Sequence, residues 1–221
     1  MTSTKQAGVL FDIDGTLLDT NYLHVVAWWR AFRDAGHRDV TMAQVHRAIG
    51  IASEELTERL IGKVDDAAVE GHSKHFEELQ QHAEALPGAA DLIRACHDRG
   101  LATVLATSAK SDDLDWMLPA IGAGDAVGGS TTSEDVEQSK PAPDLLRVAL
   151  DAHDLDPERT TVVGDTVWDV ESARGAGLPC IGLTCGGVSE QELLDAGAVE
   201  VYDDPADLLA HLDDSVLARR A

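Results

Sequence analysis

Residues 9–19 read Val-Leu-Phe-Asp-Ile-Asp-Gly-Thr-Leu-Leu-Asp, a short apolar run that ends in two closely spaced aspartates. Such a run followed by Gly15 is typical of a buried strand that leaves its sheet at a tight turn. In an open α/β sheet, ligands bind beyond the carboxyl ends of the strands, where Asp12 and Asp14 fall. A continuing strand would point the two side chains to opposite faces, so the turn must bring them to one site. An acidic turn in an Asp-rich chain is the alternative interpretation of this segment by itself.

Short β-rich runs alternate with helical patterns along most of the chain, which predicts βαβ units around a parallel sheet. We expect strands at Val9–Asp12, Ala102–Thr107, Ala126–Gly128, Thr161–Gly164, Cys180–Leu183 and Val199–Tyr202. We expect helices at Ala89–Arg99, Asp112–Met117, Pro143–Asp151, Trp168–Ala176, Ser189–Ala196 and Pro205–Leu212. Several of these strands are almost entirely apolar, as expected of a sheet that helices cover on both faces.

Residues 21–85 break this alternation, because only helical patterning is found there. Apolar positions such as Leu23 and Val26 recur at helical spacing. A helical insertion of this length after the first strand indicates a second domain. We therefore predict a catalytic core made of residues 1–20 and 86–221, and a helical cap domain made of residues 21–85.

The composition is that of a globular chain with a strongly acidic surface. The 221 residues include 40 acidic and 17 basic side chains, which give a formal net charge of −23. Such a surface repels phosphate backbones, so we expect no nucleic-acid partner, and a phosphate site must supply its own local cations. No apolar run approaches the roughly 18 residues of a membrane span, and Met1–Gly8 lacks the layout of a signal peptide, so no membrane partner is expected. A solvated surface and salt adaptation both account for the charge.

The three cysteines, Cys96, Cys180 and Cys185, are odd in number and lack metal-ligand spacing. We expect reduced thiols in a cytoplasmic protein. The sequence predicts no particular oligomeric state.

Two further segments bring hydroxyl and ammonium groups toward the same edge of the sheet. The second apolar strand ends at Thr107-Ser108, which offers a hydroxyl and backbone N–H groups but is otherwise an ordinary turn. Lys140 lies in a proline-rich loop, where Pro141 favours an extended conformation before it and Pro143 suits a helix start. A surface lysine in a stiffened loop is the alternative, although the chain contains only five lysines.

The fourth segment reads Val162-Val163-Gly164-Asp165-Thr166-Val167-Trp168-Asp169. We expect Asp165 at a strand end and Asp169 one helical turn later on the same face. Clustered carboxylates are costly unless a cation neutralises them, so a hard divalent ion is the natural occupant of such a site. Helix capping by Asp165 is the competing interpretation.

With these four motifs in order, the chain resembles the haloacid dehalogenase superfamily, in the subfamily with a helical cap inserted after the first motif. The phosphoglycolate phosphatase and β-phosphoglucomutase group is the nearest likeness, and the match covers essentially the whole chain. The resemblance implies an α/β fold whose Rossmann-like parallel-sheet core has three layers, α/β/α. It also implies a Mg²⁺-dependent phosphohydrolase that acts on a small phosphorylated metabolite.

The resemblance assigns the carboxylates their roles. Asp12 would be the nucleophile, and Asp14 would act first as general acid and then as general base. This double role requires an environment that raises the pKa of Asp14. Mg²⁺ would be held by Asp12, the backbone carbonyl of Asp14 and Asp165, while Asp169 would act through a bound water or orient the site.

The resemblance also assigns the phosphate-binding groups. Lys140 and Thr107 would be catalytic, since phosphoryl transfer depends mostly on positioning and charge neutralisation. Gly15 and Ser108 would bind phosphate together with them. His24 occupies a position that lies near the substrate in relatives, although an ordinary helix-surface histidine is the slightly preferred interpretation.

Other reactions of the superfamily differ at identifiable positions. Dehalogenases and phosphonatases lack an aspartate at the position of Asp14. A phosphosugar mutase of the β-phosphoglucomutase type retains all four motifs and is the alternative function. After Gly50, where the mutase pattern has an arginine, this chain has Ser53 followed by Glu54 and Glu55, which favours hydrolysis. A non-catalytic binding module is the alternative from another class, and phosphoglycolate, sugar phosphates and nucleotide monophosphates all stay open as substrates.

The rings of the insertion are interpreted as packing groups. At most one of the adjacent Trp28 and Trp29 can face the apolar interior of the insertion. His72 and His75 could share a helix face, but without a third ligand we expect them on a solvated surface.

Overall fold

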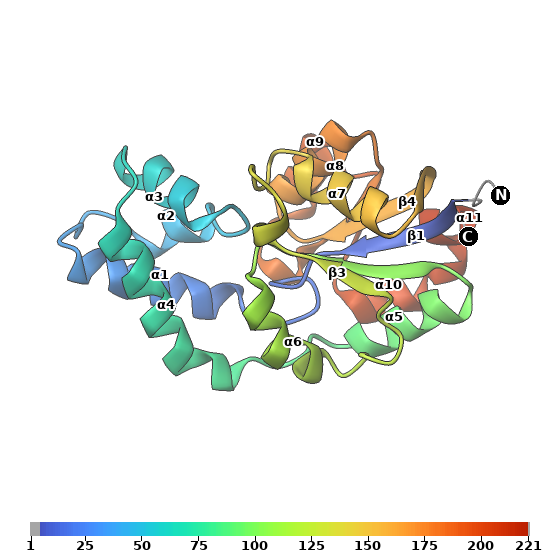
Figure 1. Cartoon of the computed structure of the whole chain (residues 1–221), viewed down its shortest axis with the longest axis horizontal. Coiled ribbons are helices and arrows are strands. Elements are labelled where there is room, and N and C mark those ends of the chain that lie inside the picture. Colours follow the sequence, from blue (N-terminus) through green and yellow to red (C-terminus); the bar gives the residue numbers. More distant parts are fainter. Residues whose placement is uncertain (1–4, 221) are drawn as a thin grey trace.

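The computed structural model describes residues 5–220 and centres on a parallel sheet (Figure 1). The strand order is β3-β2-β1-β4-β5-β6, and all neighbouring strands run parallel. The strands are β1 Gln6–Phe11, β2 Ala102–Ala106, β3 Gly129–Thr131, β4 Leu155–Gly164, β5 Cys180–Leu183 and β6 Glu200–Tyr202. The chain builds outward from β1 on one side and then on the other, so the carboxyl end of β1 is a topological switch point where ligands bind. The predicted α/β class is confirmed.

Helices cover both faces of the sheet and complete the three layers (Figure 1). The helices on one face are α5 Ala89–Asp98, α6 Leu114–Ile121, α10 Pro205–Ala210 and α11 Val216–Arg220. Those on the other face are α7 Asp144–Ala152, α8 Val167–Ala176 and α9 Glu190–Ala196. The layers are held by two separate apolar clusters, one on each face of the sheet.

Strand β1 is anchored in both layers. Val9 and Phe11 pack into the cluster with α5, whereas Leu10, between them, packs into the cluster with α7 and α8. This alternation follows from the two-residue period of a strand. Full burial of each side chain stabilises the fold by roughly 1.5–3 kcal/mol. The strand therefore fixes the position of Asp12, the residue that follows it.

The predicted strand at Ala126–Gly128 is wrong, because the third strand comes directly after it, at Gly129–Thr131. Ala126 is buried against the core, but its N–H donates to Ala123 in a turn. Apolar burial here thus reflects packing without strand pairing. Helix α6 also extends beyond its predicted end, Met117, to Ile121.

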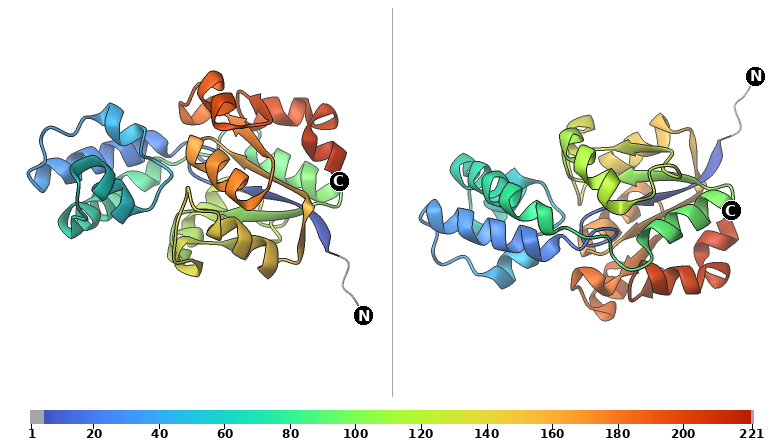
Figure 2. Two further views of the ribbon diagram at one scale, coloured as in Figure 1. Left: turned by 90° about the horizontal axis from the view of Figure 1, so that it is seen from above. Right: turned by 90° about the horizontal axis from the view of Figure 1, so that it is seen from below.

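The helical insertion forms its own body at one end of the sheet, as both views of Figure 2 show. Its helices are α1 Asn21–Asp34, α2 Met42–His46, α3 Ser53–Ile61 and α4 Asp66–Leu79. They share an apolar cluster that includes Trp28 and Phe32. The adjacent Trp29 lies under the guanidinium of Arg33, at 4.1 Å, so one tryptophan of the pair faces the interior as predicted. The first four residues and the last residue of the predicted core lie outside the described residues.

Within residues 5–220, the helices are all too short or too polar to cross a membrane. Cys96 and Cys180 are buried, Cys185 is half-buried, and all three thiols are free. Burial raises the pKa of Cys96 and of Cys185 to about 12, which keeps both protonated at neutral pH.

Candidate active site

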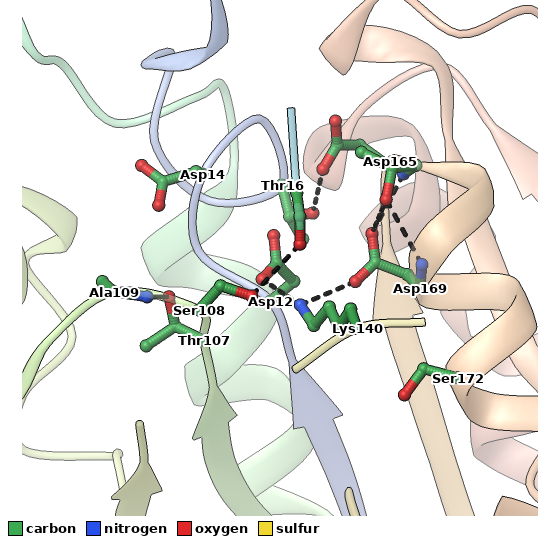
Figure 3. Close-up of polar contacts among 12 residues, drawn as sticks. Asp12, Asp14, Thr16, Thr107, Ser108, Ala109, Lys140, Asp165, Asp169 and Ser172 are labelled. Carbon is green, nitrogen blue, oxygen red and sulfur yellow. Dashed lines mark hydrogen bonds and ion pairs between the residues drawn. The ribbon is translucent and has the colours of Figure 1, made fainter. Parts of the chain in front are cut away.

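The four motifs meet at the carboxyl edge of the sheet (Figure 3). Asp12 directly follows β1, Thr107 follows β2, Asp165 follows β4, and Lys140 lies in the loop before α7. Their exposed fractions are 8%, 0%, 0% and 2%, respectively. The parallel topology thus brings residues far apart in the sequence into one water-excluded site.

The Lys140 ammonium lies between two carboxylates. Its Nζ is 2.5 Å from Asp12 Oδ1 and 2.7 Å from Asp169 Oδ1. Burial disfavours the charged form, but Asp12 and Asp169 outweigh that effect and raise the pKa of Lys140 above its usual value. The alternative of a surface lysine is therefore wrong. The loop is held from below by Ser172, whose hydroxyl donates to the Ala142 carbonyl at 2.9 Å.

Asp12, Asp165 and Asp169 form a buried carboxylate cluster, in which one ligand oxygen of each lies within 4.8 Å of the others. Burial raises the pKa of Asp12 to about 7 against the opposing effect of Lys140, and Asp169 and Asp14 raise it further. Burial and the repulsion from Asp169 and Asp12 raise the pKa of Asp165 well above its usual value. A divalent cation would relieve this repulsion, and carboxylate oxygens are the ligands that Mg²⁺ prefers. The residues therefore fit the ion that the family implies.

Asp165 is held through both of its oxygens. Thr16 Oγ1 donates to Oδ1 at 2.9 Å, and Asn21 Nδ2 donates to Oδ2 at 2.7 Å. Two glycines press against the same carboxylate: a Cβ on Gly15 would lie 2.5 Å from Oδ2, and one on Gly186 only 1.7 Å. Gly15 also has a φ of +76°, which favours glycine. The turn after Asp14 thus needs glycine for both its conformation and the space that it leaves.

Asp169 completes the cap of the helix that follows, and Asp165 takes no part in it. Thr166 is the N-cap of α8, and its N–H and hydroxyl contact Asp169 Oδ2 at 3.0 and 2.5 Å. The competing interpretation of Asp165 as a cap is therefore wrong. Because the cap uses Oδ2 of Asp169, Oδ1 is left to face Lys140.

Asp14 faces the helical insertion, and its carboxylate points away from Asp165 and Asp169 in Figure 3. Its Oδ1 accepts from Thr20 Oγ1 at 2.5 Å and lies 3.2 Å from His24 Nε2. Burial raises the pKa of Asp14, but His24 and then Thr20 outweigh it and hold that pKa below its usual value. The expectation of a raised pKa is therefore wrong for this arrangement, because the insertion supplies groups that stabilise the carboxylate.

His24 is half-buried between Asp14 and α4, so the interpretation as an ordinary helix-surface histidine is wrong. Its Nδ1 lies 3.1 Å from His72 Nε2, and its ring stacks on Phe76 with centroids 3.9 Å apart. Both contacts come from α4. The pair of α1 and α4 therefore fixes the ring that touches Asp14.

The interpretation of His72 and His75 as solvated is also wrong. The ring of His72 stacks on Trp28 with centroids 4.2 Å apart. Burial, His24 and then His75 lower the pKa of His72 well below its usual value, so this imidazole is neutral. His75 is ion-paired through Nε2 with Asp34 at 2.8 Å when protonated.

The turn after β2 contacts the insertion directly. Thr107 Oγ1 accepts from the Ala109 N–H at 3.1 Å, and Ser108 Oγ donates to the Gly50 carbonyl at 3.1 Å. Gly50 lies in the loop between α2 and α3. The Ser108 hydroxyl is therefore engaged, and its backbone N–H is the group left for an anion.

The structure thus sorts the predicted site residues into two groups. The joined cluster contains Asp12, Lys140, Asp165 and Asp169, with Gly15, Thr107 and Ser108 around it, whereas Asp14 and His24 form a pair that faces the insertion. Sequence reasoning missed Thr16, Asn21 and Gly186, which surround Asp165. Hydroxyl and amide side chains close to the Asp-x-Asp-Gly segment are the only sequence signal for the first two.

The chain is similar to known proteins in sequence and in fold. The phosphoglycolate phosphatase of Rhodospirillum rubrum is 27% identical over 213 residues, which cover 90% of this chain and 88% of that protein. A hydrolase structure from Pseudomonas syringae is 34% identical with a TM-score of 0.88, covering 95% of this chain and 99% of that one. The structure of CbbY from Rhodobacter sphaeroides in complex with phosphate is 27% identical with a TM-score of 0.74, covering 94% and 99%. Residues 9–183 match the model of the haloacid dehalogenase-like hydrolases, and the chain belongs to that family.

Proposed function

We propose that the chain is a Mg²⁺-dependent phosphatase that hydrolyses a small phosphomonoester through an aspartyl-phosphate on Asp12. The observation that carries the proposal is the set of charges around that carboxylate. Lys140 Nζ lies 2.5 Å from Asp12, and Asp165 and Asp169 complete a buried cluster suited to a divalent cation. Bound Mg²⁺ would supply positive charge to the phosphoryl oxygens and keep the carboxylates ionised.

In the first half of the reaction, an Asp12 oxygen attacks phosphorus and the bond from phosphorus to the ester oxygen breaks. Asp14 delivers the proton that the leaving alkoxide needs. The ionised Asp14 of this structure must first gain that proton, and a phosphate dianion bound beside it would raise its pKa by like-charge repulsion. Lys140 offsets the repulsion between Asp12 and the incoming dianion.

In the second half, water attacks the phosphorus of the aspartyl-phosphate while Asp14 takes its proton. The bond to Asp12 breaks, which releases phosphate and regenerates the carboxylate. The low pKa that His24 and Thr20 impose on Asp14 stabilises its unprotonated form, as this step requires. The backbone around Gly15 and Ser108 and the hydroxyl of Thr107 bind the phosphoryl oxygens.

We also propose that residues 21–85 act as a cap domain that closes over the substrate. Their contacts support this role: Ser108 holds the Gly50 carbonyl, and His24 reaches Asp14. Closure of such a segment excludes water and completes the site. The first turn of α3 carries Ser53, Glu54 and Glu55 and no cation that could hold a second phosphate. A monophosphate of the size of phosphoglycolate therefore suits the site better than the bisphosphate of a mutase.

The test is phosphate release from a panel of small phosphomonoesters, which includes phosphoglycolate, sugar phosphates and nucleotide monophosphates. Each ester is assayed with Mg²⁺ and with EDTA, using wild type, Asp12→Asn and Asp19→Asn. Asp19 is an exposed carboxylate on the same loop and serves as the matched control. We expect Mg²⁺-dependent release that Asp12→Asn abolishes and Asp19→Asn retains. Release that survives Asp12→Asn, or no release from any ester, would contradict the proposal.

A further inference from the structure

We propose that Asn21 is a positioning residue of the metal site, which holds Asp165 in its ligating orientation from the first turn of the cap. The inference rests on the proposed function, because it assigns a role toward the ion that function requires. Asn21 begins α1, whereas Asp165 directly follows β4 in the core. One side chain of the insertion would thus set the geometry of a carboxylate that belongs to the sheet.

The direction of the Asn21 amide follows from its partners. Nδ2 lies 2.7 Å from Asp165 Oδ2 and 3.1 Å from the Gly186 carbonyl. The Gly186 carbonyl has no hydrogen to donate, so the nitrogen of the amide must face it, and the same nitrogen then donates to Asp165. The side chain is only 2% exposed, and water therefore cannot replace the donor easily.

The amide fits into space that two glycines leave open. A Cβ on Gly15 would lie 2.2 Å from Asn21 Nδ2, and one on Gly186 would lie 1.7 Å from Asp165 Oδ2. A side chain at either position would displace the amide or the carboxylate. The contact between Asn21 and Asp165 therefore depends on glycine at both positions.

The oxygen atom of the amide indicates that the contact of Nδ2 with Asp165 is the reason for an asparagine at this position. Asn21 Oδ1 is buried, and within residues 5–220 it has no hydrogen-bond partner. A buried polar atom without a partner destabilises the fold, and an apolar side chain of similar size would avoid that penalty. The hydrogen bond from Asn21 Nδ2 to Asp165 therefore explains why an amide, and not an apolar side chain, occupies this position.

Asp165 keeps the capacity to bind a cation while it is held. Thr16 and Asn21 each occupy one lone pair of a different carboxylate oxygen, and each oxygen retains another. Groups that orient a metal ligand in this way typically contribute about 10–100-fold to metal affinity. Thr16 lies in the motif loop of the core, so Asn21 is the donor through which the insertion reaches the ion.

The experiment measures Mg²⁺ affinity by titration calorimetry on the phosphate-free protein, comparing wild type, Asn21→Ala and His46→Ala. His46 is the matched control, because its Nε2 contacts the same Gly186 carbonyl at 2.9 Å without touching Asp165. We expect Asn21→Ala to weaken Mg²⁺ binding by about tenfold or more. We expect His46→Ala to keep the Mg²⁺ affinity within about twofold of wild type, because a residue that only docks the insertion on the core should change it by no more than that. The melting temperature of each variant in EDTA shows whether it folds. If Asn21→Ala does not fold, Asn21→Ser replaces it, because the serine hydroxyl is one bond too short to reach Asp165.

Three results would overturn the inference. An equal loss in both variants would show that the contact serves only to dock the insertion. Unchanged affinity in Asn21→Ala or its serine replacement, in a protein that binds Mg²⁺ and releases phosphate, would reject the role of Asn21 and leave the proposed function standing. Wild-type protein that neither binds Mg²⁺ nor releases phosphate would reject both.

Discussion

The carboxyl edge of the sheet and the helical insertion use their charged groups in different ways. At the edge, Lys140 is buried against Asp12 and Asp169, and its ammonium offsets part of the carboxylate charge away from water. In the insertion, the Arg33 guanidinium lies over the Trp29 ring, and histidines stack on other rings. The Arg59 guanidinium reaches from the insertion over the ring of Trp168 in α8. A change at the edge leaves a charge uncompensated in a low dielectric, whereas a change in the insertion mostly removes contacts. The two regions should therefore respond to substitution on different scales.

The largest effect is expected for Lys140→Met, which removes the only ammonium paired with Asp12 in the described chain. Breaking a buried pair on one side costs about 3–5 kcal/mol of unfolding free energy, and we also expect phosphate release to become undetectable. Urea denaturation and the phosphate assay provide the measurements. Lys110→Met, at an exposed lysine, is the control. Equal losses in the two variants would remove the basis for treating the edge as a separate electrostatic region.

Gly15→Ala should come next, because its Cβ would meet both Asn21 and Asp165. We expect a loss of about 2–3 kcal/mol in urea denaturation, from strain at positive φ together with the clash, and weaker Mg²⁺ binding. Gly36→Ala separates the two causes, since Gly36 also has positive φ, at +91°, but nothing within 4 Å of the added Cβ. If the two alanine variants lose the same stability, the close approach to Asp165 contributes nothing.

The pH dependence of stability tests the carboxylate cluster without metal. The pKa of Asp12 is raised to about 7 in the folded protein, from 3.8. The folded state therefore binds a proton that the unfolded state has lost between these values, and the stability that it contributes is present at low pH and lost as pH rises through about 7. In EDTA, we expect melting temperatures to fall by several degrees from pH 5 to pH 8, with a smaller fall in Asp12→Asn. Identical pH profiles for the two proteins would contradict the raised pKa.

A smaller effect is expected for His24→Ala. His24 is the residue through which the insertion contacts Asp14. Loss of the contact with Asp14 should lower kcat by about tenfold, less than the roughly 10²–10⁴-fold of a group that transfers the proton itself, because His24 acts only through Asp14. His75→Ala is the control, because it lies in the same helical body and pairs with Asp34 away from the site. A fall in kcat for both variants would indicate that the whole insertion, and not this ring, supports catalysis.

The smallest effect is expected for Arg47→Ala. Arg47 Nη1 lies 2.6 Å from Glu192 Oε1 and bridges the insertion and α9, but its side chain is 73% exposed. Solvent and salt screen such pairs, so the melting temperature should stay within about one degree of wild type at physiological ionic strength. A larger decrease, removed by added salt, would show that surface charge helps to hold the insertion on the core.

Sequence patterns predicted the site residues that directly follow strands. They did not predict the contacts that depend on how the insertion packs against the core. Asp12, Asp165 and Thr107 each follow an apolar run, so topology alone brings them together. The contact between Asp14 and His24 depends on the direction in which α1 leaves the first motif, and that direction has no local signal. The same holds for Asn21, which is one of many polar residues near a helix start until the fold places it beside Asp165.

The failure at Ala126–Gly128 has a similar cause. An apolar run predicts burial, but burial against α6 and pairing with β2 are different events. The strand that does pair contains Ser130 and Thr131, whose polarity masks it in the sequence. The helical content of residues 21–85 was predictable because periodicity is local, whereas the arrangement of its rings was not.

Helix α8 supports two parts of the site at once. It carries Asp169 in its first turn, and one turn later Ser172 holds the Ala142 carbonyl of the lysine loop, while Gly175 leaves room for Pro143 to pack beside it. One helix thus supports both the loop that carries the ammonium and this carboxylate. Asp12, the other partner of the ammonium, directly follows β1 in the sheet. The contact between Lys140 and Asp12 therefore joins the helix layer to the sheet at the position of the proposed nucleophile.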